Sequence, residues 1–141
     1  MPTAYLTRAV QFSAAHRYYR ADWSAERNAE AFGAGASPHG HGHTYQCLVT
    51  VKGTPDPETG MVIDLRLLDT VLEEEIVRRF DHRHLNHDVP EFADGGVMPT
   101  GESLCLHIWK RVAARLPEGC KLDRVRVQEE PALFAEYRGE A

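Results

Sequence analysis

The 141-residue sequence has few cysteines and no long apolar run. Its three cysteines, Cys47, Cys105 and Cys120, are odd in number and widely spaced. This is typical of reduced thiols in a cytoplasmic protein, not of a disulfide framework. No apolar stretch approaches the roughly 20 residues of a membrane helix, and the N-terminus lacks the apolar core of a signal peptide. We therefore expect a cytoplasmic protein without a membrane segment.

The sequence also lacks an excess of positive charge. Lys and Arg number 16 against 21 Asp and Glu, which gives a net charge of −5. Nucleic acids and anionic membrane surfaces attract basic patches, so both kinds of partner are disfavoured. Hydrophobic residues make up 43% and charged residues 26%, a globular balance. Without a linker, repeat or low-complexity tract, residues 1–141 are predicted to form a single domain.

The apolar patterns predict an α+β fold. Alternation favours strands at residues 4–16 and about 44–52, and two further strands broken near Glu130. Asp64 and Thr100 are typical N-caps of two helices, about 64–80 and 100–119. The apolar stripe predicted for the first helix consists of Leu65, Leu68, Leu72 and Ile76. The order β-β-α-α-β-β is typical of a four-stranded antiparallel sheet with two helices on one face. A polar insertion at 17–38, with a short helix near 24–32, is long for a connector and is often functional.

The most unusual stretch is "ASPHGHGHTYQCLVTV", residues 36–51. His41 and His43 share a strand face with Tyr45, and His16 ends the apolar face of the first strand. Antiparallel pairing of the two strands would bring these three imidazoles together, as in a catalytic zinc site with an open position. The alternatives are hydrogen-bonded strand-end histidines or a surface cluster that includes His39. A jelly-roll metalloprotein is disfavoured by the two long helical patterns.

Two acidic positions are also candidates for a site. Glu129 shares a face with Val125 and Val127, and a buried carboxylate needs a cation or a forked donor. A planar heterocycle with an amino group beside a ring N–H would satisfy it bidentately. The alternative is that the strand ends earlier and Glu129 is solvated. Asp81 beside His82 could orient an imidazole that handles protons, although charged helix ends are common.

Six motifs together resemble the 6-pyruvoyl-tetrahydropterin synthase family, which includes the 6-carboxytetrahydropterin synthases of the queuosine pathway. In chain order they are "FSAAH" (12–16), "HGHTY" (41–45), "ETGMVIDL" (58–65), "FDHRHLN" (80–86), "PTGES" (99–103) and "QEE" (128–130). The closing "YRGE" and the "ETGMV" loop look more like the pyruvoyl branch. The resemblance spans nearly the whole chain. It implies a T-fold, in which subunits join their sheets into a barrel, and a homohexamer built as a dimer of trimers.

The resemblance also implies roles for individual residues. Zinc would be bound by His16, His41 and His43. A pterin would be anchored by Glu129, with Thr100 and Glu102 near it, and the proton relay would contain Asp81 and His82. Pterin pockets in such proteins lie between subunits, so Glu129 can serve a site whose zinc belongs to another chain.

One departure from the family concerns its general base, a cysteine a few residues before the HGH motif. Position 35, which matches the pyruvoyl-type spacing, is Gly35, and position 37, which matches the carboxy-type spacing, is Ser37. A serine hydroxyl is many pKa units weaker than a thiol. The remaining candidates for the base are His82 polarised by Asp81, a metal-bound hydroxide, and His39. Of these, His82 is favoured.

The resemblance therefore implies a zinc-dependent lyase that acts on 7,8-dihydroneopterin triphosphate, with triphosphate elimination and rearrangement of the side chain. Two related alternatives are retro-aldol cleavage of that side chain and the carboxy-type reaction, which releases acetaldehyde. In retro-aldol cleavage the base takes a hydroxyl proton, so loss of the thiol matters less. An alternative of another class is a non-catalytic pterin sensor or carrier.

Overall fold

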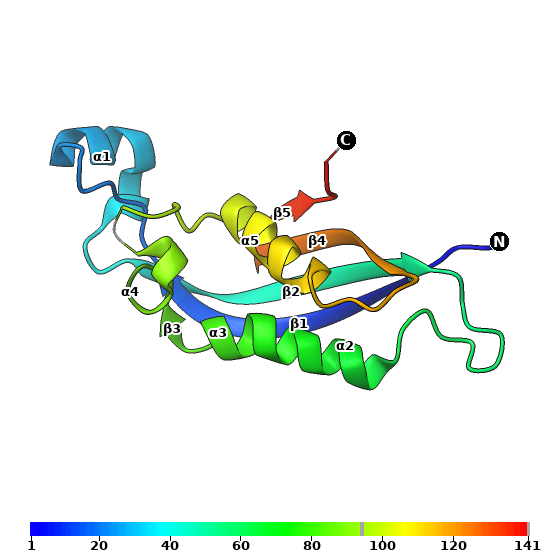
Figure 1. Cartoon of the computed structure of the whole chain (residues 1–141). Helices are drawn as coiled ribbons and strands as arrows, with labels where there is room; N and C mark the ends of the chain where they lie inside the picture. Colours follow the sequence, from blue (N-terminus) through cyan, green and yellow to red (C-terminus); the bar gives the residue numbers. More distant parts are fainter. Residues whose placement is uncertain (94, 141) are drawn as a thin grey trace.

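The computed structural model describes residues 1–93 and 95–140 (Figure 1). Its sheet has the strand order β3-β1-β2-β4-β5. The strands are β1 (Ala4–His16), β2 (His41–Gly53), β3 (Arg83–His84), β4 (Cys120–Glu130) and β5 (Leu133–Tyr137). The α-helices are α1 (Ala25–Phe32), α2 (Leu65–Leu72), α3 (Arg78–Phe80), α4 (Leu85–Asp88) and α5 (Gly101–Ala113). Shorter turns are the 3-10 helices η1 (Gly33–Ala36) and η3 (Pro90–Phe92) and the π-helix η2 (Glu73–Val77).

Three strand pairs are antiparallel, as predicted: β1 with β2, β2 with β4, and β4 with β5. The β2–β4 pair joins strands that the helical segment separates in sequence. Phe12, Tyr45 and Cys47 lie on one face of the sheet and are fully buried. On the opposite face Thr7 and Gln11 are exposed. The helices therefore cover one face, and Figure 1 shows α2, α3 and α5 running along the sheet. Burial of this single apolar face is what holds the helices to the sheet.

The predicted helix caps are confirmed. The Asp64 carboxylate accepts a hydrogen bond from the backbone N–H of Arg66, and the Thr100 hydroxyl accepts one from Ser103. In the insertion, Ser24 caps α1 in the same way. Each cap satisfies a backbone donor that the first helical turn leaves unpaired. The helix that follows Asp64 continues through η2 and α3 to Phe80, with its buried side chains Leu68, Val71, Leu72, Ile76 and Phe80 against the sheet.

Three details differ from the sequence prediction. The sheet has a fifth strand, because the two-residue β3 pairs in parallel with Ala14 and Ala15 of β1. β2 begins at His41 instead of Thr44, so the histidine motif is part of the strand. Leu65, assigned to the apolar stripe of the helix, is 38% exposed, because it stands in the first turn. None of these changes alters the α+β class.

The three cysteines are free and buried, as expected for core thiols. Within the described ranges, the helices are too short or too polar to span a bilayer. The insertion that carries α1 projects beyond one end of the sheet, next to the end where β1 finishes and β2 starts (Figure 1). That end of the sheet holds the candidate site.

Candidate active site

The strand register brings the three predicted histidines together. His16 is opposite His41 across the β1–β2 ladder, and Ala14 is opposite His43. The candidate ligand atoms of the three rings all lie within 4.8 Å of one another, and the His16 and His41 Nε2 atoms are 3.1 Å apart. The predicted convergence of these side chains is confirmed. We call His16, His41 and His43 the histidine cluster.

His16 is held in one orientation by groups behind it. Its Nδ1 lies 2.7 Å from the Pro99 carbonyl oxygen, which fixes Nδ1 as the protonated donor and leaves the Nε2 lone pair free. The Tyr45 hydroxyl is 3.3 Å from the same Nδ1. Burial lowers the pKa of His16 to about 4, against the opposing effect of the Pro99 hydrogen bond. The ring is therefore neutral at physiological pH, the form that binds metals.

The geometry of the histidine cluster fits a divalent metal ion. Ligands of a tetrahedral ion with bonds near 2.05 Å stand about 3.3 Å apart, close to the observed separation of the two Nε2 atoms. The Nε2 atom of His43 is buried and forms no hydrogen bond within the described residues. Such an orphaned nitrogen is costly to bury, and a metal ion bound by its lone pair would satisfy it. The donor set of three imidazoles leaves a fourth position for water or a substrate oxygen.

Glu129 lies next to the histidine cluster. Its residue is 8% exposed, and its Oε2 is 3.7 Å from His43 Nε2. The β4–β5 pairing skips Glu129, since Gln128 pairs with Phe134 and Glu130 with Leu133. The side chain nevertheless keeps the buried face of β4 that carries Val125 and Val127. The predicted inward orientation of this carboxylate is confirmed, and within one chain it already borders the cluster.

A cavity of about 460 Å³ opens in front of Glu129. The side chains predicted to lie near the pterin, Thr100 and Glu102, line it together with Glu129. A Cβ on Gly101 would lie only 3.2 Å from Glu129 Oε1, so glycine lets the start of α5 approach the carboxylate. The remaining wall consists of Leu133, Phe134, Ala135 and Glu136 from β5 and of Tyr18. We call this space the Glu129 cavity.

Tyr18 was missed by the sequence analysis, because it lies in the polar insertion with no periodic pattern around it. Its ring packs edge-on against His16, with ring centroids 4.8 Å apart, and its side chain lines the Glu129 cavity. Burial, together with the negative charges of Glu129 and Glu102, raises the pKa of the Tyr18 hydroxyl well above its usual value. Tyr18 therefore remains a protonated donor at neutral pH.

Asp81 and His82 lie at the outer edge of β1. Asp81 Oδ1 accepts a hydrogen bond from the Ser13 backbone N–H at 2.8 Å, and the His82 N–H donates to the Ser13 carbonyl at 2.7 Å. The His82 backbone has φ 58°, a left-handed conformation unusual for a non-glycine residue. Its ring is 86% exposed, with Nε2 3.7 Å from Asp81 Oδ2.

The structure places His82 away from the Glu129 cavity. It borders a separate, open hollow of about 650 Å³, which His43, Thr44 and Asp88 also line. Among the described residues, those that line the Glu129 cavity do not include Asp81 or His82. The structure thus brings the Asp81–His82 pair together but leaves its imidazole facing outward.

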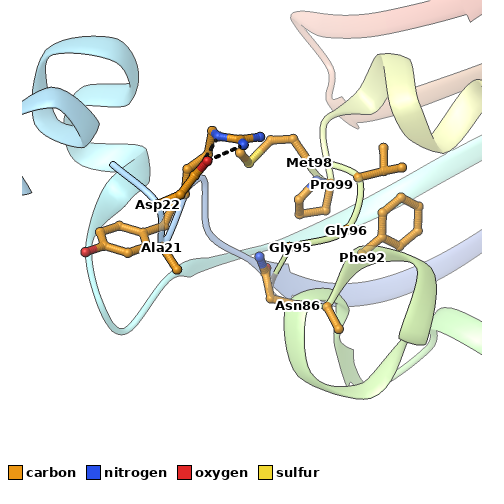
Figure 2. A pocket seen from close by; sticks show the side chains of 12 residues that line it. Ala21, Asp22, Asn86, Phe92, Gly95, Gly96, Met98 and Pro99 are labelled. Carbon is orange, nitrogen blue, oxygen red and sulfur yellow. Dashed lines mark hydrogen bonds and ion pairs between the residues drawn. The ribbon is translucent and has the colours of Figure 1, made fainter. Parts of the chain in front are cut away.

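A further cavity, of about 300 Å³, lies behind Pro99 (Figure 2). Figure 2 shows Phe92, Met98 and Pro99 on one side and Ala21 and Asp22 on the other. Three of its polar side chains are paired: Arg20 binds Asp22 through two hydrogen bonds of 3.0 and 2.8 Å, and Asn86 hydrogen-bonds the Arg17 backbone. Its wall includes Pro99, whose carbonyl oxygen accepts the hydrogen bond from His16.

Comparison with known proteins gives consistent matches. A family model described as "PTPS: 6-pyruvoyl tetrahydropterin synthase" matches residues 5–140. The 6-pyruvoyl tetrahydrobiopterin synthase of Homo sapiens is 42% identical over 97% of this chain and 92% of its own length. The solved 6-pyruvoyl tetrahydropterin synthase of Caenorhabditis elegans is 31% identical, with a TM-score of 0.92, and the match covers 99% of this chain and 98% of that one. This likeness confirms the predicted T-fold.

A shorter match has a different name. The dihydroneopterin monophosphate aldolase of Pyrococcus furiosus is 34% identical over 89 residues, which is 63% of this chain and 69% of that protein. Both kinds of relative are named for reactions on pterin compounds.

Proposed function

Because the chain belongs to the 6-pyruvoyl tetrahydropterin synthase family, we propose that it is a zinc-dependent lyase that acts on 7,8-dihydroneopterin triphosphate. The observation that carries the proposal is the histidine cluster beside a buried carboxylate and a cavity of about 460 Å³. The reaction would eliminate triphosphate and rearrange the side chain to the 6-pyruvoyl product. The family and its named synthases are enzymatic, which supports turnover over a mere binding role.

Glu129 would anchor the pterin ring. A carboxylate this deeply buried needs donors, and the amino group and adjacent ring N–H of a pterin would supply two parallel hydrogen bonds. Thr100 and Glu102 line the same cavity, at the start of α5. A ring held there would direct its side chain toward the histidine cluster, because Glu129 lies 3.7 Å from His43.

His16, His41 and His43 would hold the metal ion, for which zinc suits a set of three neutral imidazoles. When bound, the ion would coordinate the side-chain hydroxyls of the substrate and make the attached carbon's proton more acidic. The Pro99 carbonyl keeps the His16 ring in the tautomer that this role requires.

His82 would be the general base, oriented by Asp81. Its imidazole is exposed, and among the described residues it is not part of the lining of the Glu129 cavity of its own chain, which supports a role toward a neighbouring subunit. The base would then act only in an assembled oligomer, in which one chain binds the pterin and the next offers His82. A homohexamer of two trimers meets this requirement.

A second candidate is retro-aldol cleavage of the side chain, supported by the match to the Pyrococcus furiosus aldolase. There the base removes a hydroxyl proton, so Gly35 in place of a thiol has less effect on the chemistry. The carrier hypothesis has no such support, since the relatives described above are named for enzymes. None of these relatives is named as a 6-carboxytetrahydropterin synthase, so the carboxy-type reaction has no such support either.

Incubation with dihydroneopterin triphosphate, followed by chromatography and mass spectrometry of the products, separates these reactions. We expect the 6-pyruvoyl species from the metal-loaded protein, no product after chelation, and loss of product in His82→Ala. His87→Ala is the matched control, because His87 is an exposed histidine of the same segment. A 6-hydroxymethyl product would establish the aldolase reaction instead. Unchanged substrate beside an active relative would contradict both.

A further inference from the structure

The ring of Tyr18 is held between two parts of the site. On one side it meets the histidine cluster edge-on, with centroid distances of 4.8 Å to His16 and 6.2 Å to His41. On the other side it packs on Phe32, the last residue of α1, at 6.0 Å. Its side chain also lines the Glu129 cavity. The ring thus forms a wall that touches both the metal ligands and the space proposed for the pterin.

Gly35 leaves the room that this ring fills. A Cβ on residue 35 would lie 2.8 Å from Cδ2 of Tyr18, closer than real Cβ atoms approach other atoms. The two segments are tied at the same point, because the Tyr18 backbone N–H donates to the Gly35 carbonyl at 2.7 Å. Phe32 and His16 restrict rotation of the ring away from residue 35. A side chain at position 35 and a tyrosine at position 18 therefore compete for one volume.

We propose that Tyr18 is a positioning residue for the pterin and that Gly35 is its obligatory steric partner. The ring of Tyr18 occupies the volume of a side chain at position 35 and forms the wall of the Glu129 cavity next to the histidine cluster. This inference rests on the proposed function for the identity of the ligand. It also gives a structural reason why position 35 has no side chain, because the Tyr18 ring occupies the volume that a Cβ would need.

A fluorescence titration that measures neopterin binding to the metal-loaded protein tests the role of the Tyr18 ring without requiring turnover. We expect Tyr18→Leu to weaken neopterin binding about tenfold, through loss of an aromatic wall. Tyr18→Phe keeps the ring and should restore most of the affinity. Tyr19→Ala is the matched control, because Tyr19 lines the cavity of Figure 2 instead. Metal content should stay at the wild-type value in all three variants, since each retains the three histidines.

A double-mutant cycle tests the steric pairing. Gly35→Ala should lower both the melting temperature and the neopterin affinity when Tyr18 is present. In the Tyr18→Leu background the same substitution should have little further effect, because the smaller side chain leaves space for the new Cβ. Equal losses in both backgrounds, or unchanged neopterin binding in Tyr18→Leu, would overturn the inference. These readouts do not depend on which product the enzyme forms, so a failure of the proposed reaction would be seen separately in the turnover assay.

Discussion

At the scale of single residues, the site combines groups that bind with groups that orient them. His16 is buried and held by the Pro99 carbonyl, 83 residues away in sequence. Glu129 shares the buried face of β4 with Val125 and Val127, and its Oε2 lies 3.7 Å from His43 Nε2. The His16 ring is thus oriented before a ligand arrives. Such preorganisation is what allows a small site to select a substrate.

Glu129→Gln should separate pterin binding from metal binding. The amide keeps the shape of the side chain but loses the charge and one acceptor, so we expect neopterin affinity to fall by about 10–100-fold. Metal content should be unchanged, because Glu129 is not one of the clustered imidazoles. Glu130→Gln is the matched control, because Glu130 is the next residue in the chain and is exposed. Equal neopterin affinity in both variants, measured by fluorescence titration, would show that Glu129 is not the anchor.

Much of this residue-level arrangement could be predicted from sequence. Antiparallel pairing of the two alternating strands is enough to put His16 beside the HGH motif, because side chains two apart share a face. The inward orientation of Glu129 follows from the same rule. Tyr18 could not be predicted, because its position depends on the path of the insertion and on the missing side chain at Gly35. The outward orientation of His82 depends on its left-handed backbone, which no periodicity signals.

At the scale of elements, the helical layer is joined by charges as well as by the core. Glu75 of η2 lies against α5 and the residues after it, accepting hydrogen bonds from Arg111 at 2.7 Å and from Arg115 at 3.0 Å. Glu74 also accepts from Arg115. The Glu75 side chain is largely buried, so these pairs are less screened by solvent than ordinary surface ion pairs. They fix the rotation of η2 relative to α5.

Glu75→Gln should lower the free energy of unfolding by about 1–2 kcal/mol at pH 7, because two partly buried contacts with arginine lose their charge partner. Burial tends to raise the pKa of Glu75, but the hydrogen bonds from Arg111 and Arg115 outweigh it and lower that pKa from its ordinary value. A depressed folded-state pKa stabilises the fold above the unfolded-state value. The difference between wild type and variant should therefore shrink as the pH falls from about 4.5 through the folded-state pKa.

Urea denaturation between pH 3 and pH 7 measures this difference. Glu74→Gln serves as the control, because its carboxylate is more exposed and contacts only Arg115. Its effect should stay within about 0.5 kcal/mol. A pH-independent loss in Glu75→Gln would show that the carboxylate acts by packing and not by charge.

Element boundaries were predictable where a local signal exists. Ser24, Asp64 and Thr100 cap their helices, and the caps fix where α1, α2 and α5 begin. No cap residue or other local sequence signal marks the π-helix η2. It adds one residue to a helical turn, and this changes the spacing of the apolar residues too little to be detected in the sequence. The strand β3 is only two residues long, too short for alternation to indicate it. Its formation depends on the turn at His82 and on pairing with β1.

At the scale of the whole molecule, the sheet is open, with an edge strand on each side. In the part of the chain that the structure describes, helices cover one face of the sheet, and β3 and β5 are edge strands. Edge strands present unpaired N–H and C=O groups, which proteins usually cover or join to another sheet. On β5 the side chains of Leu133 and Phe134 are exposed beside the Glu129 cavity. An assembly through this edge would cover both the backbone groups and the apolar side chains.

We predict that the protein is a homohexamer and that Leu133→Asp dissociates it. A charge at this edge would have to be desolvated in the assembled barrel, which disfavours association. Analytical ultracentrifugation should give six times the mass of one chain for the wild type and a smaller species for the variant. Leu106→Asp is a matched control, because Leu106 and Leu133 are both 52% exposed but Leu106 lies on α5 and not at the sheet edge. A monomeric wild type with full activity would contradict both the assembly and the shared site.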